Sequence, residues 1–187
     1  IFLISDEPYR EIVYDGITVP YVMNYYDDSI VCYSYSKSLS LPGERIGYVA
    51  VNPLCTDAQN IYYAICGAGR VLGYVCAPSL FQRVVAKCVR LTGDVEEYKK
   101  NRDLLTSALS SYGYEFVKPQ GAFYLFIKAF GGDANAFGKE AKKLGLLLVP
   151  SDSFGVEGYV RASYCVSADM IKRSLPAFKK LAEIYKK

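Results

Sequence analysis

A lysine stands between serines in the segment Ser34-Tyr35-Ser36-Lys37-Ser38, and an arginine, Arg45, follows eight residues later. A β-branched and aromatic run precedes the lysine, and the arginine opens a second apolar run after a short Pro/Gly turn, so we expect both side chains at strand edges. A lysine amine attacks a carbonyl only when it is deprotonated, which a nearby fixed cation and partial burial favour. The spacing therefore indicates covalent chemistry on Lys37, with Arg45 as the neighbouring cation.

Two further segments place reactive groups at the end of a strand or within one. Asp6-Glu7-Pro8-Tyr9 follows the apolar run at residues 1–4, which puts a carboxylate and a phenol where the strand stops. Arg161 lies inside the alternating, strand-like segment at residues 159–164. Each residue alone has an ordinary explanation, since an aspartate before a proline is common turn chemistry and most lysines are solvated. Their order along the chain favours a common functional site over these separate explanations.

In that order the motifs resemble the second half of a pyridoxal-phosphate-dependent aminotransferase of class I/II, fold type I, similar to aspartate aminotransferase. The resemblance extends over nearly the whole chain and implies that about half of the family's chain precedes it. It is carried by the following motifs: Asp6-x-x-Tyr9, Ser34-x-Ser36-Lys37, Arg45, Gly121-Ala122-Phe123-Tyr124 and the Arg161 strand.

The resemblance implies a role for each residue around the cofactor. Lys37 would form the Schiff base with the aldehyde of pyridoxal 5'-phosphate and then carry the proton between substrate and cofactor. Asp6 would keep the pyridine nitrogen protonated, so that the ring can accept electrons. Tyr9 would hydrogen-bond the phenolic oxygen of the ring. The chain contains no histidine that could compete with Lys37 as the general base.

The remaining site residues would hold anions. Ser34, Ser36 and Arg45 would bind the cofactor phosphate through hydroxyl donors and a planar guanidinium. Arg161 would pair in bidentate fashion with the α-carboxylate of the substrate. The resemblance thus implies amino acid and 2-oxo acid substrates and a homodimer in the full-length parent. It leaves the choice among aspartate, aromatic and alanine-type substrates open.

Two alternatives to an active aminotransferase stay open. The chain as it stands would be a folded C-terminal fragment without autonomous catalysis, because the absent half would supply the helix N-terminus that binds the phosphate. Another fold-type-I enzyme, such as a β-lyase, would use the same lysine for a different reaction.

Composition excludes several classes of function. The net charge of the 187 residues is +3 and no basic run exceeds a pair, so nucleic acid and membrane partners are not indicated. The six cysteines lack paired metal spacing and there is no histidine, so no metal site is predicted. Cysteines in apolar contexts also favour a reducing, cytoplasmic location.

The predicted fold class is α/β. It comprises a remnant of the large-domain mixed sheet at residues 1–77, a long linking helix at 78–112 and a small α+β C-terminal domain at 113–187. Strands are expected at 1–5, 29–35, 46–51, 114–117, 122–128, 146–149 and 158–164. Helices are expected at 55–75, 79–111, 133–144 and 168–185.

Overall fold

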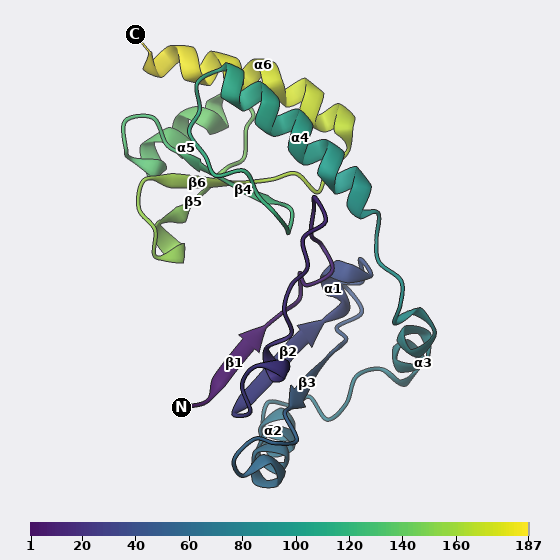
Figure 1. Cartoon of the computed structure of the whole chain (residues 1–187). Helices are drawn as coiled ribbons and strands as arrows, with labels where there is room; N and C mark the ends of the chain where they lie inside the picture. The colour runs from purple at the N-terminus through teal and green to yellow at the C-terminus, as the bar shows by residue number, and fades with distance from the viewer. Residues whose placement is uncertain (187) are drawn as a thin grey trace. The chain divides into compact units, whose positions relative to one another are not determined.

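The computed structural model describes residues 1–186, which form two compact units, one comprising Ile1–Gly93 and the other beginning at Asp94. Figure 1 shows a mixed α/β architecture with a three-stranded sheet in each unit. The α/β fold class predicted from the sequence is confirmed. Within the described residues, no helix combines the length and apolar character needed to cross a bilayer.

The first unit is built on a sheet with the strand order β1-β2-β3. Strand β2 lies at its centre and pairs in parallel with β1 and antiparallel with β3. Its elements are β1 (Leu3–Asp6), the 3₁₀ turn η1 (Val22–Asn24), β2 (Ser29–Ser34), α1 (Tyr35–Ser38), β3 (Gly47–Val51), α2 (Ala58–Val71) and α3 (Ser79–Cys88). All three predicted strands are confirmed to within two residues. Helix α2 ends before the predicted residue 75 because Gly73 adopts a φ of +86°, which stops a helix.

The second unit packs three helices around a sheet with the order β4-β6-β5. Helices α4 and α6 lie side by side in Figure 1. The elements are α4 (Val95–Ser111), β4 (Tyr124–Lys128), α5 (Ala134–Lys143), β5 (Val149–Pro150), the 3₁₀ turn η2 (Ser151–Phe154), β6 (Tyr159–Ser163) and α6 (Ala168–Tyr185). Its fully buried apolar side chains include Leu109, Leu125, Ile127, Phe137 and Leu181.

Strands β4 and β6 agree with the predicted strands at 122–128 and 158–164 to within two residues, whereas the other two predicted strands of this unit are much shorter than expected. The run at 114–117 contributes only a single bridge between Phe116 and Ile127, and Pro119, two residues after the run, cannot donate to a ladder. The strand expected at 146–149 is the two-residue β5, Val149–Pro150, so residues 146–148 lie outside the strand.

The single helix predicted across residues 79–111 is wrong, because the structure has two helices there. Helix α3 ends at Cys88, and α4 starts after Gly93, whose lack of a side chain disfavours a helical conformation. Asp94 then caps α4, its Oδ1 accepting a hydrogen bond of 3.0 Å from the backbone N–H of Glu97. Residues 78–112 are therefore not one linking helix, and α4 packs within the second unit against α6. The division at residues 77 and 112 stays a prediction.

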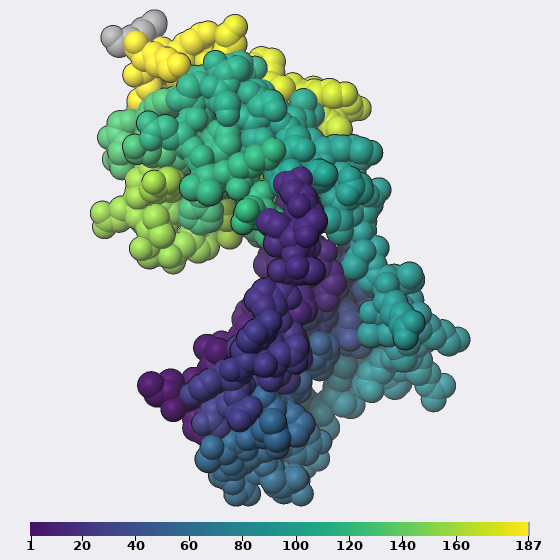
Figure 2. Space-filling model, viewed as in Figure 1, coloured from purple at the N-terminus to yellow at the C-terminus, as the bar shows by residue number. Residues whose placement is uncertain are grey.

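The beginning of β1 exposes apolar side chains. Ile1, Phe2, Leu3 and Ile4 are all exposed, Ile4 to 66%. Figure 2 shows this end of the chain, in purple, standing out from the surface of the first unit. Because β1 is an edge strand and its apolar residues face solvent, the described residues leave one edge of this sheet uncovered.

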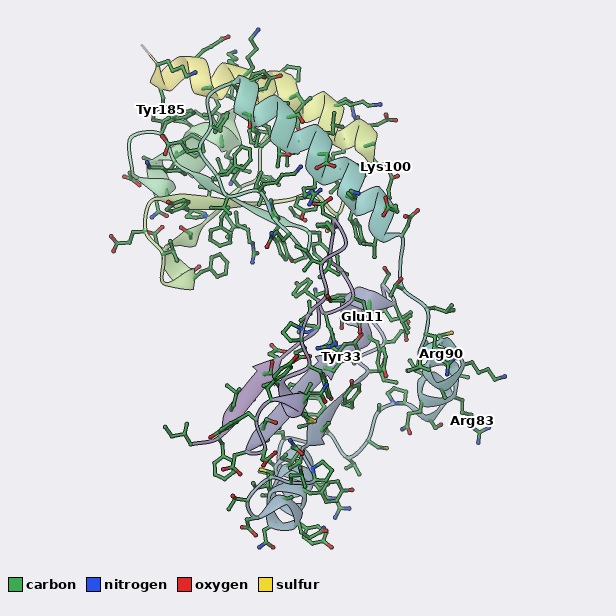
Figure 3. The ribbon with its side chains drawn as sticks, in the orientation of Figure 1. Glu11, Tyr33, Arg83, Arg90, Lys100 and Tyr185 are labelled. Atoms are coloured by element: carbon green, nitrogen blue, oxygen red, sulfur yellow. The ribbon has the colours of Figure 1, made fainter. Side chains whose placement is uncertain are left out.

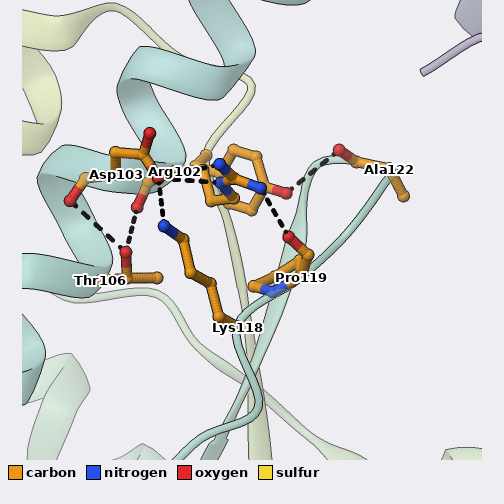
Figure 4. Close-up of polar contacts among 7 residues, drawn as sticks. Arg102, Asp103, Thr106, Lys118, Pro119 and Ala122 are labelled. Atoms are coloured by element: carbon orange, nitrogen blue, oxygen red, sulfur yellow. Dashed lines mark hydrogen bonds and ion pairs between the residues drawn. The ribbon is translucent and has the colours of Figure 1, made fainter. Parts of the chain in front are cut away.

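A buried arginine ties α4 to the loop before β4 (Figure 4). The Arg102 side chain is 1% exposed, and its Nε and Nη2 each lie 3.0 Å from Asp103 Oδ1. Its Nη1 donates to the carbonyl of Pro119 at 2.9 Å. Lys118 reaches the same carboxylate at 2.8 Å. Burial acts to raise the pKa of Asp103, but its contacts with Lys118 and Arg102 hold it below its usual value.

We predict that Arg102→Ala lowers the free energy of unfolding by about 2–4 kcal/mol, since it removes a buried side chain and leaves its hydrogen-bond partners unsatisfied. Lys118→Ala is the matched control, because it breaks an exposed ion pair with the same carboxylate and should cost less than about 1 kcal/mol. Urea unfolding measures both. Equal losses would show that burial does not distinguish the two cations.

Candidate functional site

Pairing of the strands brings several predicted site residues to one edge of the first sheet. Because β1 and β2 run in parallel with Asp6 opposite Cys32, their carboxyl ends lie at the same edge. Strand β3 runs the other way, so its first residue, Gly47, faces Ser34. Asp6, Ser34 and the residues just before Gly47 therefore meet at this edge. Ligands of open α/β sheets bind outside the carboxyl ends of the strands.

Lys37 lies in α1, a single helical turn that follows β2 directly. The sequence predicted Lys37 at the edge of a strand. In the structure it lies in a helical turn instead, because Ser34 ends β2 and acts as the N-cap of α1. Its Oγ accepts a hydrogen bond from the backbone N–H of Ser36 at 3.2 Å and donates to Ser36 Oγ at 2.8 Å. The Nζ of Lys37 lies 5.7 Å from the centroid of the Tyr9 ring. The structure thus places the Lys37 amine over the Tyr9 ring.

The two adjacent carboxylates at the end of β1 have different surroundings. Glu7 is largely buried and accepts hydrogen bonds from Ser5 at 2.9 Å and from Arg10 at 2.7 Å. Arg10 also donates to the carbonyl of Val19 at 2.9 Å. Asp6 is exposed, and its charge adds to the effect of burial in raising the pKa of the Cys32 thiol. Glu7 is therefore a structural anchor, whereas Asp6 is accessible to a ligand.

The loop that carries Arg45 is held against α1. The backbone N–H of Tyr35 donates to the carbonyl of Ile46 at 3.1 Å. A Cβ at Gly47 would overlap the carbonyl oxygen of Tyr33, so glycine permits this close approach. Arg45 is exposed, has a φ of +52° and donates from Nη1 to the carbonyl of Pro42 at 2.7 Å. The guanidinium carries further donors that can reach an anion.

Arg161 belongs to the second unit, where it occupies the central strand β6. Its guanidinium carbon lies 4.5 Å from the centroid of the Tyr124 ring and 4.6 Å from that of Phe154. Aromatic contacts of this kind engage the faces of a guanidinium, and its N–H edge is the part that recognises a carboxylate. The arrangement suits anion binding, and the role of Arg161 toward a substrate stays a prediction.

Sequence reasoning missed a hydrogen-bond network behind α1. The hydroxyl of Tyr33 lies 2.7 Å from Glu11 Oε2 and 2.7 Å from Ser38 Oγ. Burial, the main cause, raises the pKa of the Tyr33 phenol. Glu11 and Tyr33, labelled in Figure 3, lie near each other although 22 residues separate them in the chain. No spacing rule connects two such positions, so only the fold reveals the contact.

Comparison with known proteins identifies the family of this chain. The model of the family described as aminotransferase class I and II matches residues 1–178. A probable N-acetyl-LL-diaminopimelate aminotransferase of Bacillus subtilis is 33% identical over 186 residues, covering 94% of this chain and 45% of that protein. An aspartate aminotransferase of Thermotoga maritima is 27% identical, and the match covers 93% of this chain and 45% of that protein.

A solved structure of an aminotransferase from Eubacterium rectale superposes with a TM-score of 0.96 at 60% identity, covering all of this chain and 47% of the other. The chain therefore spans about half the length of the relatives it matches. Because the family model matches residues 1–178, the chain belongs to the class I and II aminotransferase family.

Proposed function

We propose that the protein carrying this chain transfers an amino group between an amino acid and a 2-oxo acid, with pyridoxal 5'-phosphate bound at the sheet edge around Lys37. One observation carries the proposal. Lys37 lies beside the Tyr9 ring at the carboxyl edge of the sheet, where Ser34 and the exposed Asp6 also lie. An amine, a carboxylate and hydroxyls at one edge are the groups that this cofactor needs.

The donor types fit the cofactor part by part. Asp6 is the accessible carboxylate for the pyridine nitrogen, since Glu7 is already engaged by Arg10. Ser34, Ser36 and Arg45 supply hydroxyl and guanidinium donors for the phosphate. When bound, pyridoxal phosphate supplies an aldehyde that bonds an amine and a ring that accepts electrons from the substrate.

Lys37 would be both the covalent anchor and the base. Its Nζ would carry the proton from the substrate Cα to the cofactor in the first half of the transfer and in the opposite direction in the second half. Tyr9, whose ring lies against Nζ, would orient the amine through its face and the cofactor through its hydroxyl. Arg161 would hold the substrate carboxylate by a bidentate pair, which fixes the direction of the Cα–H bond.

Two alternatives follow from specific observations. Because the chain spans about half of its relatives, the isolated chain would bind the cofactor weakly or not at all if the other half supplies essential phosphate donors. The exposed apolar start of β1 is consistent with such a fragment. A β-lyase would use the same residues, and a product assay for a 2-oxo acid with and without an acceptor distinguishes it from a transferase.

The proposal extends to assembly and location. We infer a homodimeric parent from the family. The six cysteines, Cys32, Cys55, Cys66, Cys76, Cys88 and Cys165, are free within the described residues, which supports a reducing, cytoplasmic environment.

The direct test mixes the chain with pyridoxal phosphate, reduces the mixture with borohydride and maps the modified lysine by mass spectrometry. We expect selective labelling of Lys37 over the exposed helix lysines. Labelling spread over many lysines would mean that the isolated chain is the inactive fragment.

In the full-length parent, Lys37→Ala should lower the rate of amino transfer at least about a thousandfold, because it removes both nucleophile and base. The cofactor should remain bound noncovalently, since Asp6, Ser34 and Arg45 are unchanged. Steady-state kinetics and cofactor retention on gel filtration measure the two effects. Lys142→Ala, at an exposed position on α5, is the control. Near-normal turnover of the Lys37 variant would refute the mechanism.

Arg161→Lys should lower kcat/KM about 10- to 100-fold, because a lysine keeps the charge and loses the planar fork. The loss should shrink for an amine substrate without an α-carboxylate, which has no group for Arg161 to bind. An equal loss for both substrates would assign Arg161 a purely structural role.

A further inference from the structure

The C-terminal end of α1 is held by side chains from two other parts of the first unit. The Tyr33 hydroxyl, on β2, contacts Glu11 Oε2 and Ser38 Oγ, each at 2.7 Å. Ser38 is the last residue of α1 and directly follows Lys37. One hydrogen-bond chain therefore joins the lysine helix to the sheet and to the segment after β1.

The direction of these hydrogen bonds follows from the groups involved. A carboxylate only accepts, so Tyr33 donates its single proton to Glu11. The Tyr33 oxygen then accepts the proton of Ser38 Oγ, and both bonds form at once. Tyr33 is 9% exposed and Ser38 is 2% exposed, so the bond between these two residues is buried, whereas the bond to Glu11 is partly buried.

Glu11, the acceptor of the network, lies in a segment that buried residues anchor. Ile12 and Tyr14, which follow Glu11, are 2% and 1% exposed. The backbone N–H of Ile12 donates to the carbonyl of Tyr9 at 2.9 Å. Glu11 and Tyr9 thus belong to one anchored turn, and that turn contacts α1 twice: Tyr9 lies against Lys37, and Glu11 connects through Tyr33 to Ser38.

Helix α1 needs such attachments because it has only four residues. A helix of this length has no stability of its own in water. Ser34 holds its start by capping, and the backbone N–H of Gly93 donates to the Ser38 carbonyl at 2.7 Å. The Tyr33 hydroxyl is the side-chain attachment at its end.

We propose that Glu11, Tyr33 and Ser38 are positioning residues that fix the Lys37 amine relative to Tyr9. Their effect on the structure belongs to the chain itself. Their effect on chemistry rests on the proposed function of Lys37.

A single substitution can remove the network while keeping the packing. In Tyr33→Phe the ring remains, and its stacking on Tyr48, with centroids 5.1 Å apart, is retained. A cavity of about 190 Å³ borders Glu11, Tyr33, Tyr35 and Ser38, so the loss of one oxygen atom forces no rearrangement. Tyr63→Phe removes the same atom from an exposed ring of α2 and is the matched control.

The first measurement is hydrogen exchange of the segment 35–41 in the chain alone, followed by mass spectrometry. We expect exchange about tenfold faster in Tyr33→Phe and unchanged in Tyr63→Phe, because the hydrogen bond between Ser38 at the helix end and Tyr33 is lost together with the bond from Tyr33 to Glu11. Equal exchange in the two variants would overturn the proposal.

The second measurement is the rate at which pyridoxal phosphate and borohydride label Lys37. Labelling should slow about tenfold in Tyr33→Phe and in Ser38→Ala, because the amine is no longer held in one orientation. Ser38→Thr should restore the rate, since it keeps the hydroxyl and the cavity accommodates its methyl group. Faster exchange with an unchanged labelling rate would overturn the positioning role.

The two measurements separate this inference from the proposed function. A wild-type chain that fails to label Lys37 selectively would count against autonomous function, and hydrogen exchange would then decide the network. Selective labelling that is equal in wild type, Tyr33→Phe and Ser38→Ala would uphold the function and overturn the network.

Discussion

The register of β2 with its two neighbours is the constraint on which the candidate site depends. Parallel pairing of Asp6 with Cys32 and antiparallel pairing of Ser34 with Gly47 bring the ends of three strands to one edge. A slip by one residue would turn every β2 side chain to the opposite face of the sheet. Gly47 permits this register, because any larger residue would collide with the backbone of β2.

Charged residues in this chain divide into those that stabilise the fold and those that remain available. Glu7 is neutralised by Arg10, and buried Arg102 by Asp103, so these pairs are used within the protein. A buried charge without such a partner would be costly. Asp6 and Arg45 are exposed at the sheet edge, and Arg161 rests on aromatic rings. This contrast is the physical basis for selecting the latter three as candidate ligand-binding groups.

Each unit has a sheet, and the two sheets differ in how far their apolar side chains are covered. In the second unit alternate residues of β4 and β6 are buried, and apolar residues such as Leu125 and Phe137 are fully buried. The first unit leaves the apolar start of β1 exposed. The relatives compared above are about twice as long as this chain, and within the described residues β1 is an edge strand of its sheet.

The sequence by itself determined the family, the three strands of the first unit and the residue types of the site, because these depend on local patterns and on the order of short motifs. It did not determine that α1 is a helical turn, that residues 79–111 form two helices or that Glu11 reaches Tyr33. The helix break at Gly93 and Asp94 was readable in principle, but amphipathic periodicity on both sides hid it. The contact of Glu11 with Tyr33 and Ser38 was not readable, because it joins segments 22 residues apart that only the pairing of β1 with β2 brings together. Local chemistry can be read from adjacent residues, whereas the position of a side chain in space depends on long-range pairing that no short window contains.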